Sequence, residues 1–334
     1  MKKDVLPPPL TSTDAALWQK ACALREQYWK KNVFLRGIVE ISNYCQQNCL
    51  YCGLRRDNTS LRRYRMEPDA IFAAARIVKR LGLGTIVLQA GEDPGFSPED
   101  IARIVSRIKN ELALAVTLSL GQWNPRVYTL WRKAGADRYL LKLETVNEKN
   151  YSLLRPGNTL AKRIRALNQL AALDYETGSG LITGLPGDTE TTIVQGMELL
   201  GKHNPDMFSL SPFIPHPETP LKRCPAGDIA ENLRAIAMAR VMLPTAHIPV
   251  TSALGLQGDA MRLQVLEVAD VLMASLTPQE VRKAYSIYPG KNLDEQAPEQ
   301  RVTHFRSLLE VSGFTVPPGP GNAWRNQQTT TRES

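Results

Sequence analysis

The sequence predicts an α/β fold, a (β/α) barrel of the TIM type that is either full or partial. Short β-branched or apolar runs alternate with longer amphipathic runs from Gly37 onward, which is typical of parallel strands joined by right-handed helical crossovers. The chain has 334 residues, 43% of them apolar, which is enough for such a barrel and its core. Three clustered cysteines follow the first predicted strand, where the reactive loops of a barrel lie.

The elements can be placed in order along the chain. The first strand is expected at residues 37–42, directly before the cysteines. Further strands are expected at 85–89, 114–119, 138–143, 180–183 and 207–211, with less regular candidates at 248–251 and 268–272. Helices are expected at 98–110, 125–134 and 159–173. This gives six regular repeats and two further candidates, which leaves the barrel either closed or partial.

Four parts are expected along the chain. Residues 1–33 form a helical N-terminal preface, with a helix over 11–32, and residues 34–278 form the barrel. Residues 279–315 form a helical C-terminal extension. Residues 316–334 are expected to be a flexible tail, because they begin with a Pro/Gly-rich run and end in polar residues.

The net charge of +8 raises the question of nucleic acid. The basic residues are scattered, apart from two short groups at 55–56 and 62–65. Nucleic-acid-binding domains more often show a continuous basic stripe with interleaved aromatic residues. We therefore expect anionic small molecules or an acidic partner protein, and no nucleic acid.

The cysteine usage and the hydropathy bear on the compartment. No apolar run approaches the roughly twenty residues of a membrane span. The N-terminus lacks the apolar core of a signal peptide. Five cysteines, three of them clustered, do not make a disulfide framework. These features favour a cytoplasmic protein that does not bind a membrane.

Cys45, Cys49 and Cys52 lie within eight residues. A [4Fe–4S] cluster has four irons, so three thiolates leave one iron open, whereas a cluster that only transfers electrons usually has four cysteine ligands. Zinc completed by a histidine is the alternative, but structural zinc sites usually combine two spaced pairs, and no second Cys-x-x-Cys occurs. The motif therefore predicts a cluster that takes part in chemistry. The isolated Cys22 and Cys224 have no assigned role.

The Cys-x3-Cys-x2-Cys motif on the first loop of a barrel resembles the radical S-adenosylmethionine (radical SAM) superfamily. Further segments resemble its biotin-synthase-like branch, and within it the HydE family of [FeFe]-hydrogenase maturases. These segments are residues 36–45, 48–58, 63–65, 85–94, 117–121, 134–141, 154–156, 184–187, 212–217 and 288–291. The resemblance spans about residues 30–292 and implies a radical SAM barrel.

The resemblance implies two cofactors. One is a [4Fe–4S] cluster held by Cys45, Cys49 and Cys52, and the other is SAM bound at the open iron, which is cleaved to a 5′-deoxyadenosyl radical. The SAM contacts it implies are Tyr51 against the adenine, Gly91, Glu92 and Asp93 at the amino group, Glu144 on the ribose, and Arg163 on the carboxylate. Guanidinium suits this last role because it binds a carboxylate through two hydrogen bonds.

Four residues are candidates on the substrate side. Arg138 in the fourth predicted strand is expected to face an anionic substrate, because a buried cation is costly unless it is paired. Lys142 follows on the same strand face and is expected to assist it. Tyr285 and Tyr288 either close the cavity from above or pack the C-terminal extension. His216, between two prolines, is interpreted as a structural loop histidine.

The substrate cavity departs from the HydE pattern. The usual Arg-His-Glu-Thr of that family is Lys142-Leu-Glu-Thr145 here, and Gly258-Asp-Ala-Met-Arg262 is closer to methylornithine synthase. The resemblance implies an enzyme acting on an iron- and cysteine-derived precursor in hydrogenase H-cluster maturation. The alternatives are a methylornithine-synthase-like lysine mutase, a HydE-like paralogue with another small substrate, and a non-catalytic cluster scaffold.

The resemblance also implies partners for this chain. They are a small-molecule substrate, an electron donor of the flavodoxin or ferredoxin type, and other maturation proteins.

Overall fold

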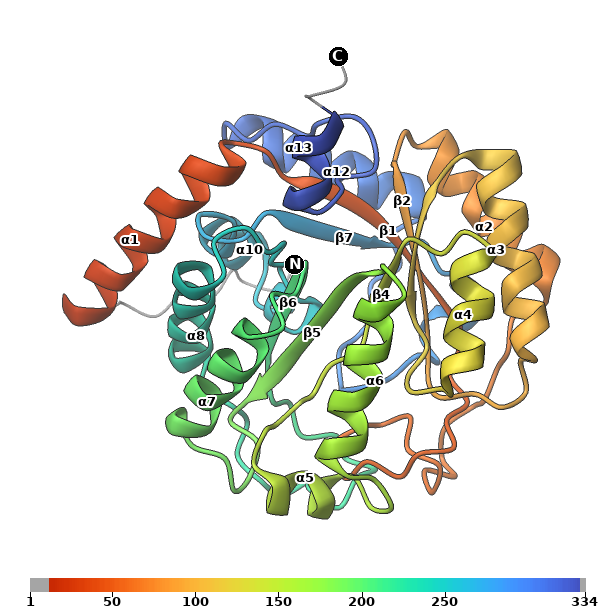
Figure 1. Cartoon of the computed structure of the whole chain (residues 1–334), viewed down its shortest axis with the longest axis horizontal. Helices are drawn as coiled ribbons and strands as arrows, with labels where there is room; N and C mark the ends of the chain where they lie inside the picture. Colours follow the sequence, from red (N-terminus) through yellow and green to blue (C-terminus); the bar gives the residue numbers. More distant parts are fainter. Residues whose placement is uncertain (1–11, 331–334) are drawn as a thin grey trace.

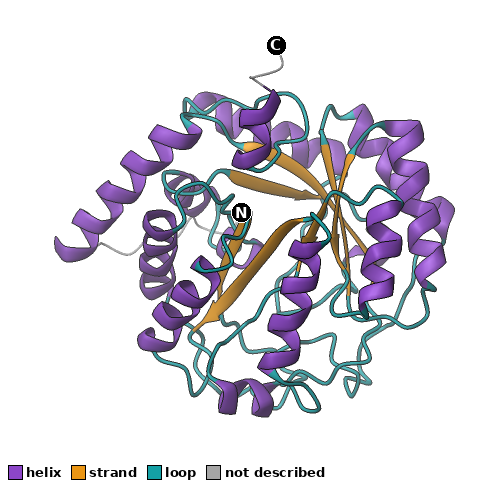
Figure 2. Ribbon diagram, viewed as in Figure 1, coloured by secondary structure: helices purple, strands orange, loops and turns teal. Residues whose placement is uncertain are grey.

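The computed structural model describes residues 12–330. Seven parallel strands curve into a partial barrel in the order β6-β5-β4-β3-β2-β1-β7, with most helices on the outside (Figures 1 and 2). The strands are β1 (Phe34–Ser42), β2 (Thr85–Ala90), β3 (Ala115–Ser119), β4 (Arg138–Leu140), β5 (Glu176–Thr183), β6 (Met207–Pro212) and β7 (Val271–Ser275). None of the helices in residues 12–330 is long and apolar enough to cross a bilayer.

The helices connect and flank these strands. They are α1 (Ser12–Trp29), α2 (Pro68–Arg80), α3 (Pro98–Leu112), α4 (Pro125–Lys133), α5 (Glu148–Leu154), α6 (Leu160–Ala172), α7 (Glu190–Gly201), α8 (Ile229–Met242), α9 (Ser252–Gly255), α10 (Asp259–Leu266), α11 (Gln279–Arg282), α12 (Pro298–Val311) and α13 (Trp324–Thr330). Strand β1 is buried along its whole length, as expected of a parallel strand that is covered on both faces.

Local sequence explains where the crossover helices begin. Helix α3 starts with Pro98 directly after Ser97, whose hydroxyl accepts from the N–H of Asp100 in a capping box. Its buried residues recur at helical spacing along one face: Ile101, Ile104, Val105 and Ile108. The same logic places α4 after Asn124, which caps that helix and precedes Pro125.

The predicted partial or full barrel is confirmed, and it is the partial form. The strand expected at 248–251 is reduced to isolated bridges, from His247 to Met207 of β6 and from Pro249 to Val271 of β7. The last regular strand is β7, three residues later than the candidate at 268–272. Because proline has no N–H to donate, Pro249 interrupts the ladder that an eighth strand would need.

The helix expected in the preface is α1. It packs along α8 on the outside of the barrel (Figure 1), and the Trp18 indole donates to the Glu267 carboxylate at 2.7 Å. At its C-terminal end, Trp29 contacts the rings of His247 and Trp324 near the amino ends of the strands.

Residues 316–330 do not form the loosely held tail that the sequence suggested. They cross the amino ends of the strands and close the base of the barrel. Thr85 donates to the Pro320 carbonyl at 2.7 Å, Arg36 donates to the Gly321 carbonyl at 3.1 Å, and the Ala323 N–H donates to Glu176 at 2.9 Å. The remainder of the predicted tail, residues 331–334, lies outside the described residues.

Candidate active site

A cavity lies at the carboxyl ends of the strands, on the face that the sequence predicted. Its empty volume is about 1090 Å³, including the part that opens to solvent, whereas a typical small-molecule site has about 300–1,000 Å³. The lining comes from the cysteine loop, the ends of β2 to β6 and the segment after α11. Most of the predicted site residues meet here: Cys45, Cys49, Tyr51, Cys52, Gly91, Glu92, Lys142, Glu144, Arg163, Tyr285 and Tyr288.

The three clustered cysteines are free thiols on one wall of this cavity. Burial raises the pKa of the Cys45 thiol to about 11 and raises the pKa of Cys52 further. Such thiols stay protonated at neutral pH unless a cation stabilises the thiolate. The donor set therefore suits a metal centre rather than a free nucleophile.

Two glycines allow the close packing around the thiols. A Cβ at Gly91 would lie 2.7 Å from the Cβ of Cys45, so only glycine lets the end of β2 approach the cysteine loop. Gly121 has φ of +77°, and a Cβ there would lie 1.9 Å from the Cγ of Glu92. At both positions the neighbouring atoms leave no room for a side chain, which explains the glycines.

Glu92 organises the polar wall beside the cysteine loop. It is 5% exposed, and its Oε1 accepts from Arg163 Nη1 at 3.3 Å and from the Gln122 N–H at 3.0 Å. Its Oε2 accepts from Gln47 at 2.5 Å, which ties it to the cysteine loop. Arg155 Nη2 lies 3.8 Å from the same carboxylate. One buried carboxylate thus holds two guanidinium groups at the cavity.

Arg155 is a site residue that the sequence reasoning did not assign. It is 5% exposed, follows α5 and donates from Nη1 to the Tyr51 hydroxyl at 2.9 Å. Its Nε is buried without a hydrogen-bond partner. The segment 154–156 was one of the family-like segments, and this was the only signal in the sequence that could have found it.

Glu144 and Lys142 lie together on another wall. Glu144 has φ of +70°, a left-handed conformation that costs about 1–3 kcal/mol for a non-glycine residue and often marks a functional site. Its Oε2 lies 3.3 Å from Lys142 Nζ, yet it has no hydrogen-bond partner. Lys142 donates to the Ser211 hydroxyl at 3.1 Å.

Tyr285 and Tyr288 both border the cavity from the segment after α11. Tyr285 is buried, and Tyr288 shares a hydrogen bond with the Ser252 hydroxyl. His216 lies outside the cavity wall, where its Nδ1 accepts from the Glu218 N–H at 3.1 Å. That contact agrees with the structural role expected for this histidine.

The structure does not bring the side chain of Asp93, which was predicted to bind the SAM amino group, into the cavity. Asp93 is 2% exposed. Its carboxylate accepts from Arg65 at 2.6 and 2.8 Å and from the Ser42 hydroxyl at 2.6 Å. These bonds anchor the segment that follows the cysteine loop, so the role of Asp93 is structural.

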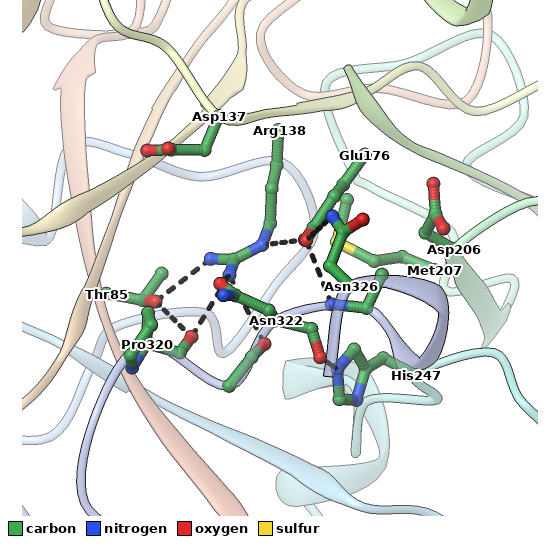
Figure 3. Close-up of polar contacts among 12 residues, drawn as sticks. Thr85, Asp137, Arg138, Glu176, Asp206, Met207, His247, Pro320, Asn322 and Asn326 are labelled. Atoms are coloured by element: carbon green, nitrogen blue, oxygen red, sulfur yellow. Dashed lines mark hydrogen bonds and ion pairs between the residues drawn. The ribbon is translucent and has the colours of Figure 1, made fainter. Parts of the chain in front are cut away.

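The structure also does not bring Arg138, which was predicted to face the substrate, into the cavity. Arg138 is the first residue of β4 and pairs in register with Glu176, the first residue of β5, so it lies at the base of the barrel. It is fully buried and forms an ion pair with Glu176, and it also donates to Thr85 at 3.0 Å and to Asn322 at 2.8 Å (Figure 3). Its charge is balanced within the protein.

Comparisons with known proteins agree with this geometry. A family model described as the radical SAM superfamily matches residues 39–200. The [FeFe] hydrogenase maturase subunit HydE of Thermotoga maritima is 44% identical over 310 residues, which are 92% of this chain and 88% of that protein. The chain belongs to the radical SAM superfamily. It is therefore an enzyme, and the predicted resemblance to HydE is confirmed.

Other radical SAM proteins are more distant. The 3-methylornithine synthase of Methanosarcina acetivorans is 28% identical over 91% of this chain and 85% of its own. The crystal structure of methylornithine synthase (PylB) has a TM-score of 0.82 at 24% identity and covers 96% of this chain and 93% of that one. HydG from Carboxydothermus hydrogenoformans has a TM-score of 0.77 at 20% identity, over 92% and 72% of the two chains. At these identities the two structures show the shared fold alone.

Radical SAM enzymes bind a [4Fe–4S] cluster through three cysteines and bind SAM, which confirms the predicted cofactors. The cavity fits both groups. Its three thiols form the donor set for iron. Two buried polar atoms without hydrogen-bond partners, Glu144 Oε2 and Arg155 Nε, are available to a polar ligand. The individual SAM contacts remain predictions.

Proposed function

We propose that this radical SAM enzyme is a cytoplasmic maturase of the HydE type. It would act on an iron- and cysteine-derived precursor during assembly of the active-site cofactor of [FeFe]-hydrogenase. The observation that carries the proposal is the 44% identity to HydE over 92% of the chain, against 28% to methylornithine synthase over a similar length.

Each part of the cavity has a role in this proposal. Cys45, Cys49 and Cys52 hold the cluster, which when bound supplies the electron that cleaves SAM into methionine and a 5′-deoxyadenosyl radical. Arg163, held by Glu92, pairs with the SAM carboxylate. Glu144 accepts from the ribose hydroxyls through the carboxylate oxygen that has no hydrogen-bond partner.

Arg155 has two tasks under this proposal. Its bond to the Tyr51 hydroxyl fixes the orientation of the tyrosine ring, which packs against the adenine. Its buried charge also adds to the positive potential around the negatively charged end of SAM and around the thiolates.

The charges that line the cavity support an anionic substrate. The cations there are Lys142, Arg155 and Arg163, and the acids are Glu92 and Glu144. Glu92 already accepts from Arg163, from Gln47 and from a backbone N–H, while the proposal assigns the open oxygen of Glu144 to the SAM ribose. A substrate with a side-chain amine would need a carboxylate free of such contacts. In this proposal Lys142 pairs with a substrate anion.

The proposal is tested by supplying the cluster-loaded protein with SAM and a chemical reductant under anaerobic conditions. An iron–cysteine dicarbonyl cyanide complex is added to one sample and lysine to another. Adenosyl products are then followed by mass spectrometry. A product that depends on the iron complex is expected, and its absence alongside active 5′-deoxyadenosine formation would contradict the HydE-type assignment.

A lysine mutase is the second candidate. It is favoured by the replacement of the HydE-type Arg-His-Glu-Thr with Lys142-Leu-Glu-Thr145, which changes the substrate wall and leaves the cysteine loop unaltered. A product that depends on lysine in the same assay would establish it. Slow 5′-deoxyadenosine formation in both samples would indicate a HydE-like paralogue with a different substrate.

A further inference from the structure

A short segment after α11 borders the cavity beside the cysteine loop. This tyrosine segment, residues 284–291, supplies three side chains of the cavity lining: Tyr285, Ile287 and Tyr288. Two of its carbonyl oxygens accept hydrogen bonds from the chain around the cysteines. The Ile287 carbonyl accepts from the Gly53 N–H at 2.9 Å, and the Ala284 carbonyl accepts from the Asn43 side chain at 2.7 Å. The segment is therefore joined directly to the loop that bears the metal ligands.

A tight turn ends the tyrosine segment. It consists of Tyr288, Pro289, Gly290 and Lys291, and the Lys291 N–H donates to the Tyr288 carbonyl at 3.4 Å. Proline in the second position and a glycine with φ of +87° in the third are typical of a type II turn. The turn therefore fixes the position of Tyr288 relative to Lys291.

The side chain of Lys291 is anchored in the protein interior. Its Nζ lies 3.0 Å from Oε1 of Glu40, and both side chains are buried. Glu40 also accepts from Ser275 at 2.9 Å, from Asn292 at 3.1 Å and from Thr277. Burial opposes charge on both groups, but their attraction and these hydrogen bonds hold the pKa of Glu40 below its ordinary value and the pKa of Lys291 above it.

Stability alone does not explain this ion pair. Replacing a buried pair by apolar residues of similar size often leaves the stability of a protein unchanged or raises it. What the pair supplies is a fixed location, because the contacts of the Glu40 carboxylate hold the Lys291 ammonium in one place. Glu40 belongs to β1, the strand that leads into the cysteine loop. The pair thus ties the turn, and with it Tyr288, to the strand that precedes the metal ligands.

We propose that Glu40 and Lys291 are positioning residues, which hold the tyrosine segment against the cysteine loop and keep Tyr288 at the wall of the cavity. Without the pair, the segment moves away from the loop, the cavity opens to solvent, and the substrate is held less closely to the radical. The effect on the substrate rests on the proposed function, whereas the opening of the cavity requires only the bound cluster.

The test compares two double variants that each remove one buried ion pair without changing the net charge. Glu40→Gln/Lys291→Met removes the pair beside the cavity and leaves no lone charge buried. Arg138→Met/Glu176→Gln removes the pair at the base of the barrel and is the matched control. A third variant, Gly290→Ala, strains the turn, because its φ is positive, and alters no buried charge.

Two quantities are measured on the cluster-loaded proteins. The first is the rate at which ferricyanide bleaches the visible absorption of the cluster in the absence of substrate, which reports access to the cavity. The second is the amount of product formed from the iron–cysteine complex for each 5′-deoxyadenosine, with dithionite as the reductant. This ratio reports how well the substrate is positioned, and a loss of overall stability alone does not change it.

Glu40→Gln/Lys291→Met and Gly290→Ala are expected to bleach several-fold faster than the wild type. Their product per 5′-deoxyadenosine should fall by about tenfold, because small displacements of a substrate are costly to its reaction. The control should match the wild type in both measurements. Bleaching at the wild-type rate in both cavity-side variants, or an equal change in the control, would overturn the inference. If Glu40→Gln/Lys291→Met does not fold, Gly290→Ala decides the outcome.

The two measurements separate this inference from the proposed function. If the wild type forms no product from the iron complex, the proposed function is wrong, and the bleaching rates alone decide whether the pair holds the tyrosine segment. If the wild type forms product and both cavity-side variants form as much for each 5′-deoxyadenosine, the positioning role alone is wrong.

Discussion

The surroundings of the cysteines distinguish the proposed cluster ligands from a cysteine that only packs. Cys45, Cys49 and Cys52 line the cavity, whereas Cys22 lies half-buried in α1, where burial raises its pKa to about 11. Cys49→Ala is expected to abolish both the visible absorption of the cluster and SAM cleavage, because three cysteines are needed to hold the cluster. Cys22→Ala should retain both. SAM cleavage at the wild-type rate by Cys49→Ala would contradict the ligand assignment.

Lys142 offers a test of the substrate wall. Lys142→Met removes the charge that faces Ser211 and Glu144 but keeps most of the side-chain volume. Substrate-dependent product should fall about 10- to 100-fold, the typical value of a lost charged hydrogen bond, while uncoupled 5′-deoxyadenosine formation stays near the wild-type rate. Lys162→Met, on the exposed face of α6, is the matched control. If product formation and uncoupled 5′-deoxyadenosine formation fall equally, Lys142 contacts SAM rather than the substrate.

Strand periodicity predicted which face Arg138 and Lys142 share, but not their depth in the barrel. The four steps along the chain from Arg138 to Lys142 correspond to about 13 Å along an extended strand, which separates the base from the cavity. The position of Asp93 outside the cavity could not be predicted for another reason, because its partner Arg65 comes from a loop whose path the sequence does not reveal. Arg155 was missed because its contacts to Tyr51 and Glu92 join distant segments.

Among the elements, the base of the barrel depends on one buried ion pair. Arg138→Ala leaves Glu176 buried without its partner, so the free energy of unfolding should fall by about 3–5 kcal/mol. The double variant Arg138→Met/Glu176→Met removes both charges, so its free energy of unfolding should fall much less. Urea denaturation followed by circular dichroism measures both. If Arg138→Ala keeps the wild-type stability but loses substrate turnover, Arg138 acts in the active site and the structural role is contradicted.

The same pair gives the stability a dependence on pH. Burial would raise the pKa of Glu176, but Arg138 and the hydrogen bonds from the tail hold it below its ordinary 4.5. A carboxylate with a lowered pKa stabilises the fold above its unfolded pKa, and this contribution is lost as the pH falls through the folded value. Glu176→Gln should therefore lose less stability than the wild type between pH 6 and pH 3.5 in urea titrations. If the wild type and Glu176→Gln lose the same stability over this pH range, the assignment of the effect to Glu176 is contradicted.

The composition of residues 316–330 is a poor guide to their structure. A Pro/Gly-rich run is typical of disorder, but here two glycines allow close contact with the barrel. Gly321 has φ of +57°, and a Cβ there would lie 2.5 Å from the Phe34 ring. The Gly319 carbonyl lies only 2.0 Å from where a Cβ at Gly84 would be. Most strand positions, by contrast, were predicted to within a few residues because most strands contain an apolar run.

In the molecule as a whole, the two ends of the barrel use buried charge differently. At the base, Arg138 and Glu176 satisfy one another and the tail covers them (Figure 3). At the opposite end, polar atoms of Glu144 and Arg155 remain without partners beside three thiols. The sequence predicted the barrel and the cysteine face. It could not predict the shape of the cavity, because the walls come from segments more than two hundred residues apart.

The central claim is that the three-cysteine cluster at the open end of the barrel binds SAM directly. The most direct test is electron paramagnetic resonance of the reduced, fully loaded protein with and without SAM. The account predicts that SAM changes the cluster signal in the wild type. It also predicts a weaker response in Glu144→Ala, which removes the proposed ribose contact. An identical spectrum with and without saturating SAM would contradict the claim.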